Sequence, residues 1–114
     1  MAQGITAVKL GPDGIVLFDA HGRIATLKWT AIDRLRAYQH NVFMYALTCI
    51  DIHVAESNYL WTLTEETQDF WDFSDYCKQL LPSFDSNWEA VVRATPNAEN
   101  SLIIYSKSPL TGRP

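Results

Sequence analysis

The residues whose types and spacing could best support metal binding or acid–base chemistry lie on two neighbouring predicted strands. Asp51 and His53 are two positions apart in the alternating segment 46–54, so their side chains should project from the same face. A carboxylate beside an imidazole suits a metal site or acid–base chemistry. His40, on the preceding strand, is a candidate cross-strand neighbour that would complete a small metal-dependent or ligand-binding site. The alternative is that the pair decorates the solvated face of a half-buried strand, since no third ligand is identifiable.

A second candidate site is an acidic segment that contains no lysine or arginine. Within eleven residues the segment holds Glu65, Glu66, Asp69, Trp71, Asp72 and Asp75. On a helix, Glu65, Asp69 and Asp72 would share a face, and such a face suits a basic protein partner and speeds association by electrostatic steering. An aromatic side chain beside acidic residues also fits an interface. The alternative is an ordinary solvated face, favoured by the dipole at the start of a helix.

Sequence signatures of nucleophilic or nucleotide chemistry are missing. The chain has no GxSxG, no phosphate-binding loop motif and no GxGxxG. Cys49 shares a predicted strand face with His53, but residues four apart on a strand are separated by about 13 Å, too far for proton transfer. Cys49 and Cys77 lack zinc-site spacing and should be reduced, mostly buried thiols. We therefore assign no catalytic residue, metal ligand or cofactor from sequence, and a non-enzymatic role is favoured.

Length and composition indicate one folded domain. With 114 residues, 47% hydrophobic and 12% aromatic, the chain can bury a core without disulfides or metal. We predict a single domain over residues 1–107 and a loose C-terminal tail over 108–114. No apolar run approaches the roughly 18 residues of a membrane span, and the N-terminus has no signal-peptide pattern. We expect a cytoplasmic protein without a membrane partner.

The charge balance disfavours nucleic acid as a partner. Nine lysines and arginines against thirteen acidic residues give a net charge of -4. Phosphate contact needs clustered positive charge, and Asp33 interrupts the densest basic stretch, which holds Lys28, Arg34 and Arg36. A basic protein partner fits this charge better.

Turn residues and hydrophobic periodicity define the elements that must position these side chains. Gly11-Pro12-Asp13-Gly14 is a strong turn signal that joins the first two strands as a hairpin. The predicted strands cover residues 5–10, 15–19, 23–29, 35–40, 46–54, 59–63 and 101–107. Alternation breaks at 29–35, which indicates a bulge or a single helical turn. The face of segment 46–54 that looks inward should carry Ala46, Thr48, Ile50, Ile52 and Val54.

The hydrophobic period changes after Thr64 from that of a strand to that of a helix. One helix should begin near 64–67, end before Pro82, and bury Phe70, Phe73, Cys77, Leu80 and Leu81. A second should begin at a capping box of Ser86 and Glu89, end at Pro96, and bury Trp88, Val91, Val92 and Thr95. The predicted fold class is α+β: an antiparallel sheet of five to six strands built from hairpins, two short C-terminal helices packed on it, and a final strand.

One set of segments resembles a known kind of protein. The segments are Gly14–Asp19, Leu27–Ile32, Thr64–Glu66, Leu80–Asp85 and Trp88. Over roughly residues 14–106 they are similar to small uncharacterised bacterial proteins with a compact, pleckstrin-homology-like or related α+β fold. Some proteins of that kind act as immunity partners of toxins. The resemblance implies a structural likeness and a protein-binding role, and it implies no functional residue.

Three functional hypotheses follow. The first is a small non-enzymatic protein-binding module, of immunity type, whose acidic helix face binds a basic partner. The second is a small metal-dependent or ligand-binding site at His40, Asp51 and His53. The third is a homo-oligomeric structural module that pairs through an exposed strand edge.

Overall fold

The computed structural model describes residues 4–42, 45–55, 60–94 and 101–107. In chain order its strands are β1 (Ala7–Leu10), β2 (Gly14–Asp19), β3 (Gly22–Lys28), β4 (Ile32–Val42), β5 (Tyr45–Val54), β6 (Leu60–Thr64) and β7 (Leu102–Ser106). A 3-10 turn, η1 (Trp29–Ala31), separates β3 from β4, and the helices α1 (Phe70–Leu80) and α2 (Trp88–Ala94) precede β7. The α+β class, the strands before the helices, the two helices and the final strand confirm the prediction from sequence.

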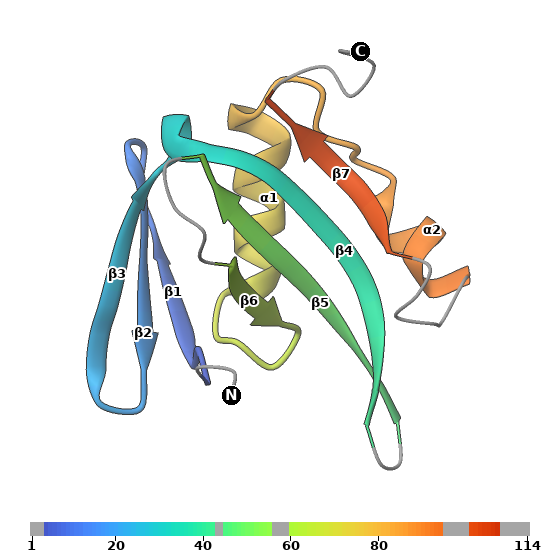
Figure 1. Ribbon diagram of the computed structural model, residues 1–114, viewed down its shortest axis with the longest axis horizontal. Coiled ribbons are helices and arrows are strands. Elements are labelled where there is room, and N and C mark those ends of the chain that lie inside the picture. Colours follow the sequence, from blue (N-terminus) through green and yellow to red (C-terminus); the bar gives the residue numbers. More distant parts are fainter. Residues whose placement is uncertain (1–3, 43–44, 56–59, 95–100, 108–114) are drawn as a thin grey trace.

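The strands form two antiparallel sheets rather than the single sheet that the sequence predicted. The first has the order β1-β2-β3 and the second the order β6-β5-β4-β7 (Figure 1). The break between them is η1, where Trp29 is buried and its indole Nε1 donates a hydrogen bond to the carbonyl of Gly11 at 2.8 Å. The interrupted alternation at 29–35 is therefore the boundary between two sheets, and pairing restarts at Ile32.

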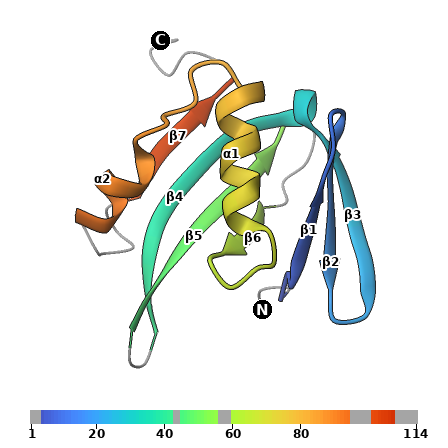
Figure 2. The same ribbon diagram turned by 180° about the vertical axis from the view of Figure 1, so that it is seen from behind.

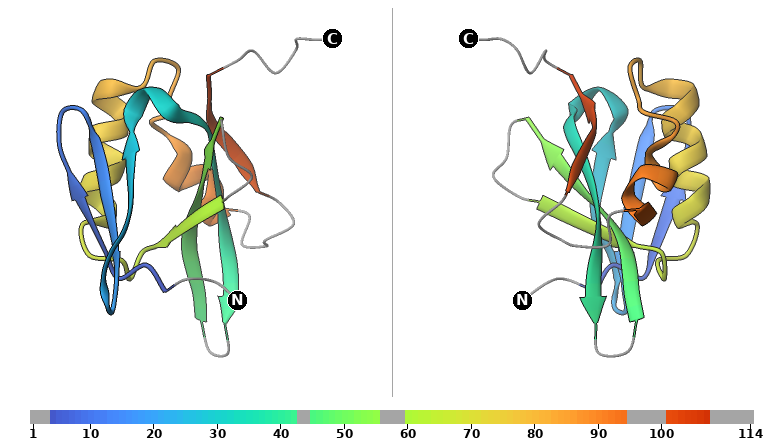
Figure 3. Two further views of the ribbon diagram at one scale, coloured as in Figure 1. Left: turned by 60° about the vertical axis from the view of Figure 1, so that its left-hand side comes forward. Right: turned by 90° about the vertical axis from the view of Figure 1, so that its right-hand side faces the viewer.

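Both helices lie on one face of the four-stranded sheet, which we call the inner face (Figure 2). Strand β1 runs beside α1, and a parallel bridge between Ala7 and Gln68 joins β1 to the segment that connects β6 to α1. No described helix or strand covers the opposite face of the four-stranded sheet, which we call the outer face (Figure 3). Side chains at alternate positions of β4, β5 and β6 therefore face either the core or solvent.

The core lies between the inner face, the helices and the three-stranded sheet, which contributes Val8, Ile15 and Leu17. Residues Thr48, Ile50 and Ile52 of β5 are fully buried there, in agreement with the predicted inward face. The Trp29 ring stacks on Phe73 and on Tyr76, with centroids 6.0 Å and 6.1 Å apart. These aromatic contacts bury large areas, and they tie the turn between the two sheets to α1.

Two helix positions predicted to be buried are exposed. Leu80 is 41% exposed and Val91 is 40% exposed, because each lies at the margin of the buried stripe of its helix. Ser74 is buried instead, since its hydroxyl oxygen accepts a hydrogen bond from Nε1 of Trp88 at 3.0 Å. The predicted burial of Phe70, Phe73, Cys77, Leu81, Trp88 and Val92 is confirmed.

The helix starts also differ from the sequence prediction. Helix α1 begins at Phe70, after Asp69 in the left-handed conformation with φ 67°, which aspartate tolerates better than most residues. Helix α2 begins after Asp85, whose carboxylate accepts a hydrogen bond from the backbone N–H of Asn87 at 3.0 Å. This hydrogen bond lies just ahead of Trp88, the first residue of the helix, and the capping box of Ser86 and Glu89 stays a prediction.

Some sequence predictions concern residues outside the described ranges. Thr95 and the predicted tail over residues 108–114 lie outside the described residues. None of the helices in the described ranges is long and apolar enough to cross a membrane.

Candidate functional site

A pocket opens on the outer face of the four-stranded sheet, where β4, β5 and β6 lie side by side. It is lined by Arg34, Arg36, Asp51, His53 and Leu60, which we call the arginine pocket, and its volume is about 220 Å³. The antiparallel register places Arg34 opposite His53 and Arg36 opposite Asp51. Directly opposed side chains have Cβ atoms about 5 Å apart, and neighbours two apart on one strand are about 7 Å apart. The register thus gathers four polar side chains in a two-by-two array.

An irregularity in β4 brings a further acid to the edge of this array. The register shifts between Ile32 and Arg34, so Asp33 is an extra residue with no partner in the β4–β5 ladder. Oδ2 of Asp33 lies 3.3 Å from Nδ1 of His53. β-Bulges of this kind redirect side chains and recur next to functional sites. The bulge is therefore what places a second carboxylate beside the pocket.

Two nitrogen atoms of this pocket lack hydrogen-bond partners. Nε of Arg34 and Nδ1 of His53 are the buried side-chain atoms without a partner in the part of the chain that the structure describes. The contact from His53 to Asp33 is within ion-pair distance but does not have hydrogen-bond geometry, so it leaves Nδ1 unsatisfied. A buried polar group without a partner costs about 1–3 kcal/mol. Both unsatisfied atoms belong to one pocket, which singles out this place on the surface.

The guanidinium groups of Arg34 and Arg36 are not paired with any described side chain. Within the described ranges, the side chains of Arg34 and Arg36 make no hydrogen bond or ion pair, although Asp51 lies opposite Arg36. Each guanidinium carries five donors in a planar fork that matches the geometry of carboxylate and phosphate oxygens. The pocket therefore offers two adjacent, fixed positive charges with open donor capacity.

The carboxylate of Asp51 is held by hydroxyl groups from both neighbouring strands, β4 and β6. Its Oδ1 accepts hydrogen bonds from Tyr38 Oη at 2.9 Å and from Thr62 Oγ1 at 2.7 Å. Burial, together with the neighbouring charge of Asp51, raises the pKa of Tyr38 well above its usual value, so Tyr38 remains a hydrogen-bond donor at neutral pH. The described bonds leave Oδ2 of Asp51 available to a group in the pocket.

Cys49 lies on the same face but is not an activated nucleophile. Burial first, and then the charge of Asp51, raise the pKa of the Cys49 thiol to about 12. A thiol acts as a nucleophile in its ionised form, so a raised pKa makes it inert near neutrality. Cys77 is also buried, and burial raises the pKa of its thiol.

His40 does not join Asp51 and His53, contrary to the sequence hypothesis. It lies opposite Leu47, four residues along β4 from Arg36 and thus about 13 Å from the pocket. The described residues contain no group of three His, Cys, Asp or Glu side chains placed to hold a metal ion. What the sequence did bring out correctly is that Asp51 and His53 share the outer face.

Sequence reasoning missed the two arginines that complete the pocket. Arg34 and Arg36 were weighed as part of a basic stretch along the chain, whereas their significance comes from lying opposite His53 and Asp51. The available signal was that Arg34 and Arg36 are two apart on a predicted strand, like Asp51 and His53. Pairing the two sets requires the register, which depends on the turn and on the bulge at Asp33.

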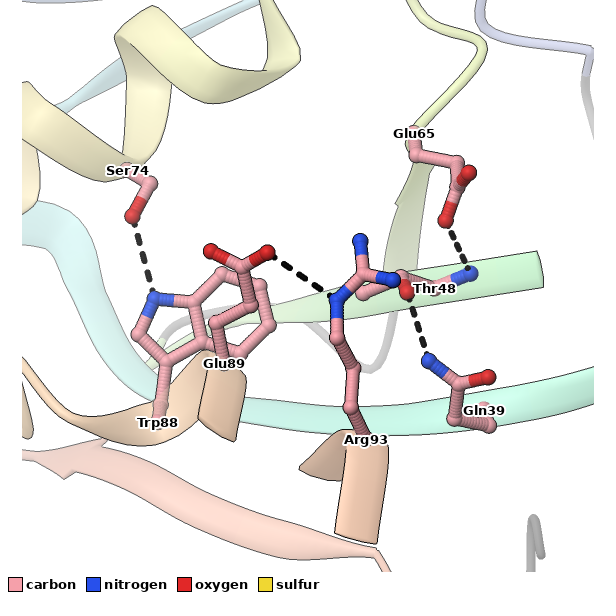
Figure 4. Close-up of polar contacts among 7 residues, drawn as sticks. All are labelled: Gln39, Thr48, Glu65, Ser74, Trp88, Glu89 and Arg93. Atoms are coloured by element: carbon pink, nitrogen blue, oxygen red, sulfur yellow. Dashed lines mark hydrogen bonds and ion pairs between the residues drawn. The ribbon is translucent and has the colours of Figure 1, made fainter. Parts of the chain in front are cut away.

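The acidic segment, the other candidate site, separates into two parts. Glu65 lies before α1, and its carboxylate accepts a hydrogen bond from the backbone N–H of Thr48 at 2.9 Å (Figure 4). Glu66 accepts a hydrogen bond from the Tyr45 hydroxyl at 3.0 Å. These two acids therefore connect the end of β6 to β5. The predicted alignment of Glu65 with Asp69 and Asp72 on one helix is wrong, because the helix begins later.

The remaining acids form an exposed stripe on α1. Asp69, Asp72 and Asp75, the aspartate stripe, line a shallow hollow of about 330 Å³ beside Lys9 of β1. Asp75 lies 3.8 Å from Lys78. Trp71, which is 38% exposed, stacks on Trp88, with the Arg93 guanidinium 5.9 Å from the centre of its ring. Trp71 is thus partly engaged in packing α1 against α2.

Comparisons with known proteins do not assign the chain to a family. No protein-family model, no curated protein and no solved structure matches it. The resemblance to pleckstrin-homology-like bacterial proteins therefore stays a prediction, and the function has to be argued from the site.

Proposed function

We propose that this protein is a non-enzymatic binding module that holds an oxyanion group, a phosphate or a carboxylate, in the arginine pocket. The observation that carries the proposal is that both buried, unsatisfied nitrogen atoms of the described chain, Nε of Arg34 and Nδ1 of His53, line this pocket. An oxyanion supplies the acceptors that Arg34 lacks, and charge-assisted hydrogen bonds of this kind are about twice as strong as neutral ones.

The size of the pocket supports a small ligand or a single head group. Sites for drug-sized molecules usually measure about 300–1,000 Å³, whereas this pocket measures about 220 Å³. Leu60, which is 48% exposed, adds one apolar wall. The pocket therefore suits one oxyanion with a few attached carbon atoms.

The chemistry of the surrounding residues supports binding over catalysis. The thiol of Cys49 has a raised pKa, and Tyr38 is held as a donor to Asp51. Neither group is poised to attack a bound ligand near neutral pH. The role that we assign to the arginines is recognition.

Isothermal titration with inorganic phosphate at constant ionic strength tests this proposal. We expect saturable binding that is lost when Arg34→Met and Arg36→Met are combined. The matched control is Arg23→Met, which removes an exposed arginine from β3 of the other sheet and should leave phosphate binding unchanged. Equal binding by all three proteins, or no binding by the unaltered protein, would sink the proposal.

A second candidate function is binding of a basic, toxin-like protein through the aspartate stripe. The observation in its favour is that Asp69 and Asp72 have no counter-charge within ion-pair distance in the described chain and line one hollow. Its test is a pull-down at low and at high salt with Asp69→Lys combined with Asp72→Lys. A partner retained by the double variant, or retained at high salt, would argue against this surface.

A further inference from the structure

The position of Asp51 in the arginine pocket bears on which oxyanion the pocket accepts. Asp51 lies opposite Arg36 in the strand register and lines the same pocket. A carboxylate this close repels a bound phosphate, and the repulsion is strong in a partly desolvated site. An anion site whose sole purpose was charge attraction would be better without Asp51.

We infer that Asp51 selects ligands whose oxyanion is joined to a hydrogen-bond donor, a hydroxyl or an ammonium group, as in a small phosphorylated alcohol or amine. This inference rests on the proposed oxyanion site and adds the second recognition element. Arg34 and Arg36 bind the phosphate, and Oδ2 of Asp51 accepts the hydrogen bond of the attached group.

The hydrogen bonds of Asp51 fit this role. Tyr38 and Thr62 both donate to Oδ1, from 2.9 Å and 2.7 Å, and so fix the orientation of the carboxylate. With Oδ1 accepting two hydrogen bonds, Oδ2 has no hydrogen bond from a described residue, and we assign it to the donor of the ligand. A charged acceptor held in one orientation discriminates strongly against a ligand without a donor, because it is then left unpaired next to an anion.

The dimensions of the array agree with a short ligand. Arg34 and His53 form one row, Arg36 and Asp51 the next, and the rows are about 7 Å apart. A phosphate between the arginines would lie beside β4, and a donor two carbon atoms away would reach across to Asp51 on β5, whose Cβ is about 5 Å from that of Arg36. The pocket volume of about 220 Å³ accommodates such a molecule and little more.

The test uses three probes that differ at a single substituent: ethyl phosphate, hydroxyethyl phosphate and aminoethyl phosphate. We expect the unaltered protein to bind the hydroxyl or the ammonium compound about tenfold more tightly than ethyl phosphate. The probe that binds more tightly than ethyl phosphate identifies which donor, hydroxyl or ammonium, binds to Asp51. In Asp51→Asn, whose side-chain oxygen can still accept from Tyr38 and Thr62, this preference should disappear and ethyl phosphate should bind at least as tightly as before.

A matched variant separates the charge of Asp51 from its packing. Thr62→Val removes one hydrogen bond to Oδ1 but keeps the carboxylate, so the preference should persist. If all three probes bind through Arg34 and Arg36 with one affinity order in the unaltered protein and in Asp51→Asn, the selectivity is refuted while the oxyanion site stands. Failure of every probe to bind, or binding that is insensitive to Arg34→Met with Arg36→Met, overturns both.

Discussion

The two faces of the four-stranded sheet differ in whether their buried side-chain nitrogen atoms are hydrogen-bonded. On the inner face, Gln39 Nε2 donates to Thr48 Oγ1 at 2.6 Å, and Glu65 accepts from the backbone of Thr48 (Figure 4). On the outer face, the buried Nε of Arg34 and Nδ1 of His53 have no hydrogen-bond partner within the described residues, although Oδ2 of Asp33 lies 3.3 Å from Nδ1. Buried polar groups in proteins are normally satisfied, so the contrast is informative.

The difference in hydrogen bonding between the two faces indicates which polar residues stabilise the fold. A buried group that is paired stabilises the structure, and removing its partner is costly. A buried group that the protein leaves unsatisfied does not stabilise the fold, and we attribute the two in this pocket to ligand binding. We therefore expect substitutions on the inner face to change the free energy of unfolding, and substitutions in the arginine pocket to change ligand binding.

The largest effect is expected for Trp88→Ala. Trp88 is 1% exposed, and its Nε1 donates to Ser74, so the substitution creates a cavity and leaves Ser74 without its partner. We expect a loss of about 3–5 kcal/mol in the free energy of unfolding, measured by urea denaturation. Trp71→Ala, which removes the exposed ring of the stacked pair, should cost distinctly less. Equal losses would show that the exposed ring of Trp71 contributes as much to stability as the buried ring of Trp88, contrary to this account.

A smaller effect is expected for Thr48→Val. This substitution keeps the shape of the side chain but leaves Nε2 of Gln39 buried without an acceptor. The expected loss is about 1–3 kcal/mol in urea denaturation. Combining it with Gln39→Leu removes both polar partners, so the double variant should be less destabilised than the sum of the two single variants. Simple additivity would contradict a direct pairing.

Alkaline pH should weaken the fold through its buried thiols. Burial raises the pKa of Cys49 to about 12 in the folded chain, while a free thiol in the unfolded chain has a pKa of about 8.5. The contribution of the protonated Cys49 thiol to the free energy of unfolding is fully present below about pH 8.5. It is lost as the pH rises from there to about 12, because the thiol of the unfolded chain releases its proton first. The unfolding free energy should fall by up to about 1.4 kcal/mol per pH unit from this thiol. In Cys49→Ala the slope should be shallower, and an identical slope would refute the assignment.

The smallest effect on stability is expected for Arg34→Met. Nε of Arg34 makes no hydrogen bond with a described residue, so its loss removes an unsatisfied group and keeps most of the apolar stem. The unfolding free energy should stay within about 0.5 kcal/mol of the unaltered protein. A loss comparable to that of Thr48→Val would mean that Arg34 serves the fold, and the contrast between the two faces would fail.

The sequence predicted those features that depend on local patterns. Strict alternation identified the inner face of β5, and the period of Phe70, Phe73 and Cys77 identified the buried side of α1. The division into two sheets was not predictable, because it depends on Trp29 packing against Phe73 and Tyr76, which are distant in sequence. Only part of the arginine pocket was predictable. Strand alternation put Asp51 and His53 on one face. The strand register, which adds Arg34 and excludes His40, required the tertiary structure.

The most direct test of the central claim is an NMR titration with inorganic phosphate that follows the side-chain Nε–H signal of each arginine. The unpaired Nε–H of Arg34 should shift in a saturable way, together with that of Arg36 and with one dissociation constant. Arg93, whose Nε already donates to Glu89 at 3.0 Å, should remain unchanged. A stationary Arg34 signal, or a linear shift shared by all the arginines, would contradict an oxyanion site in this pocket.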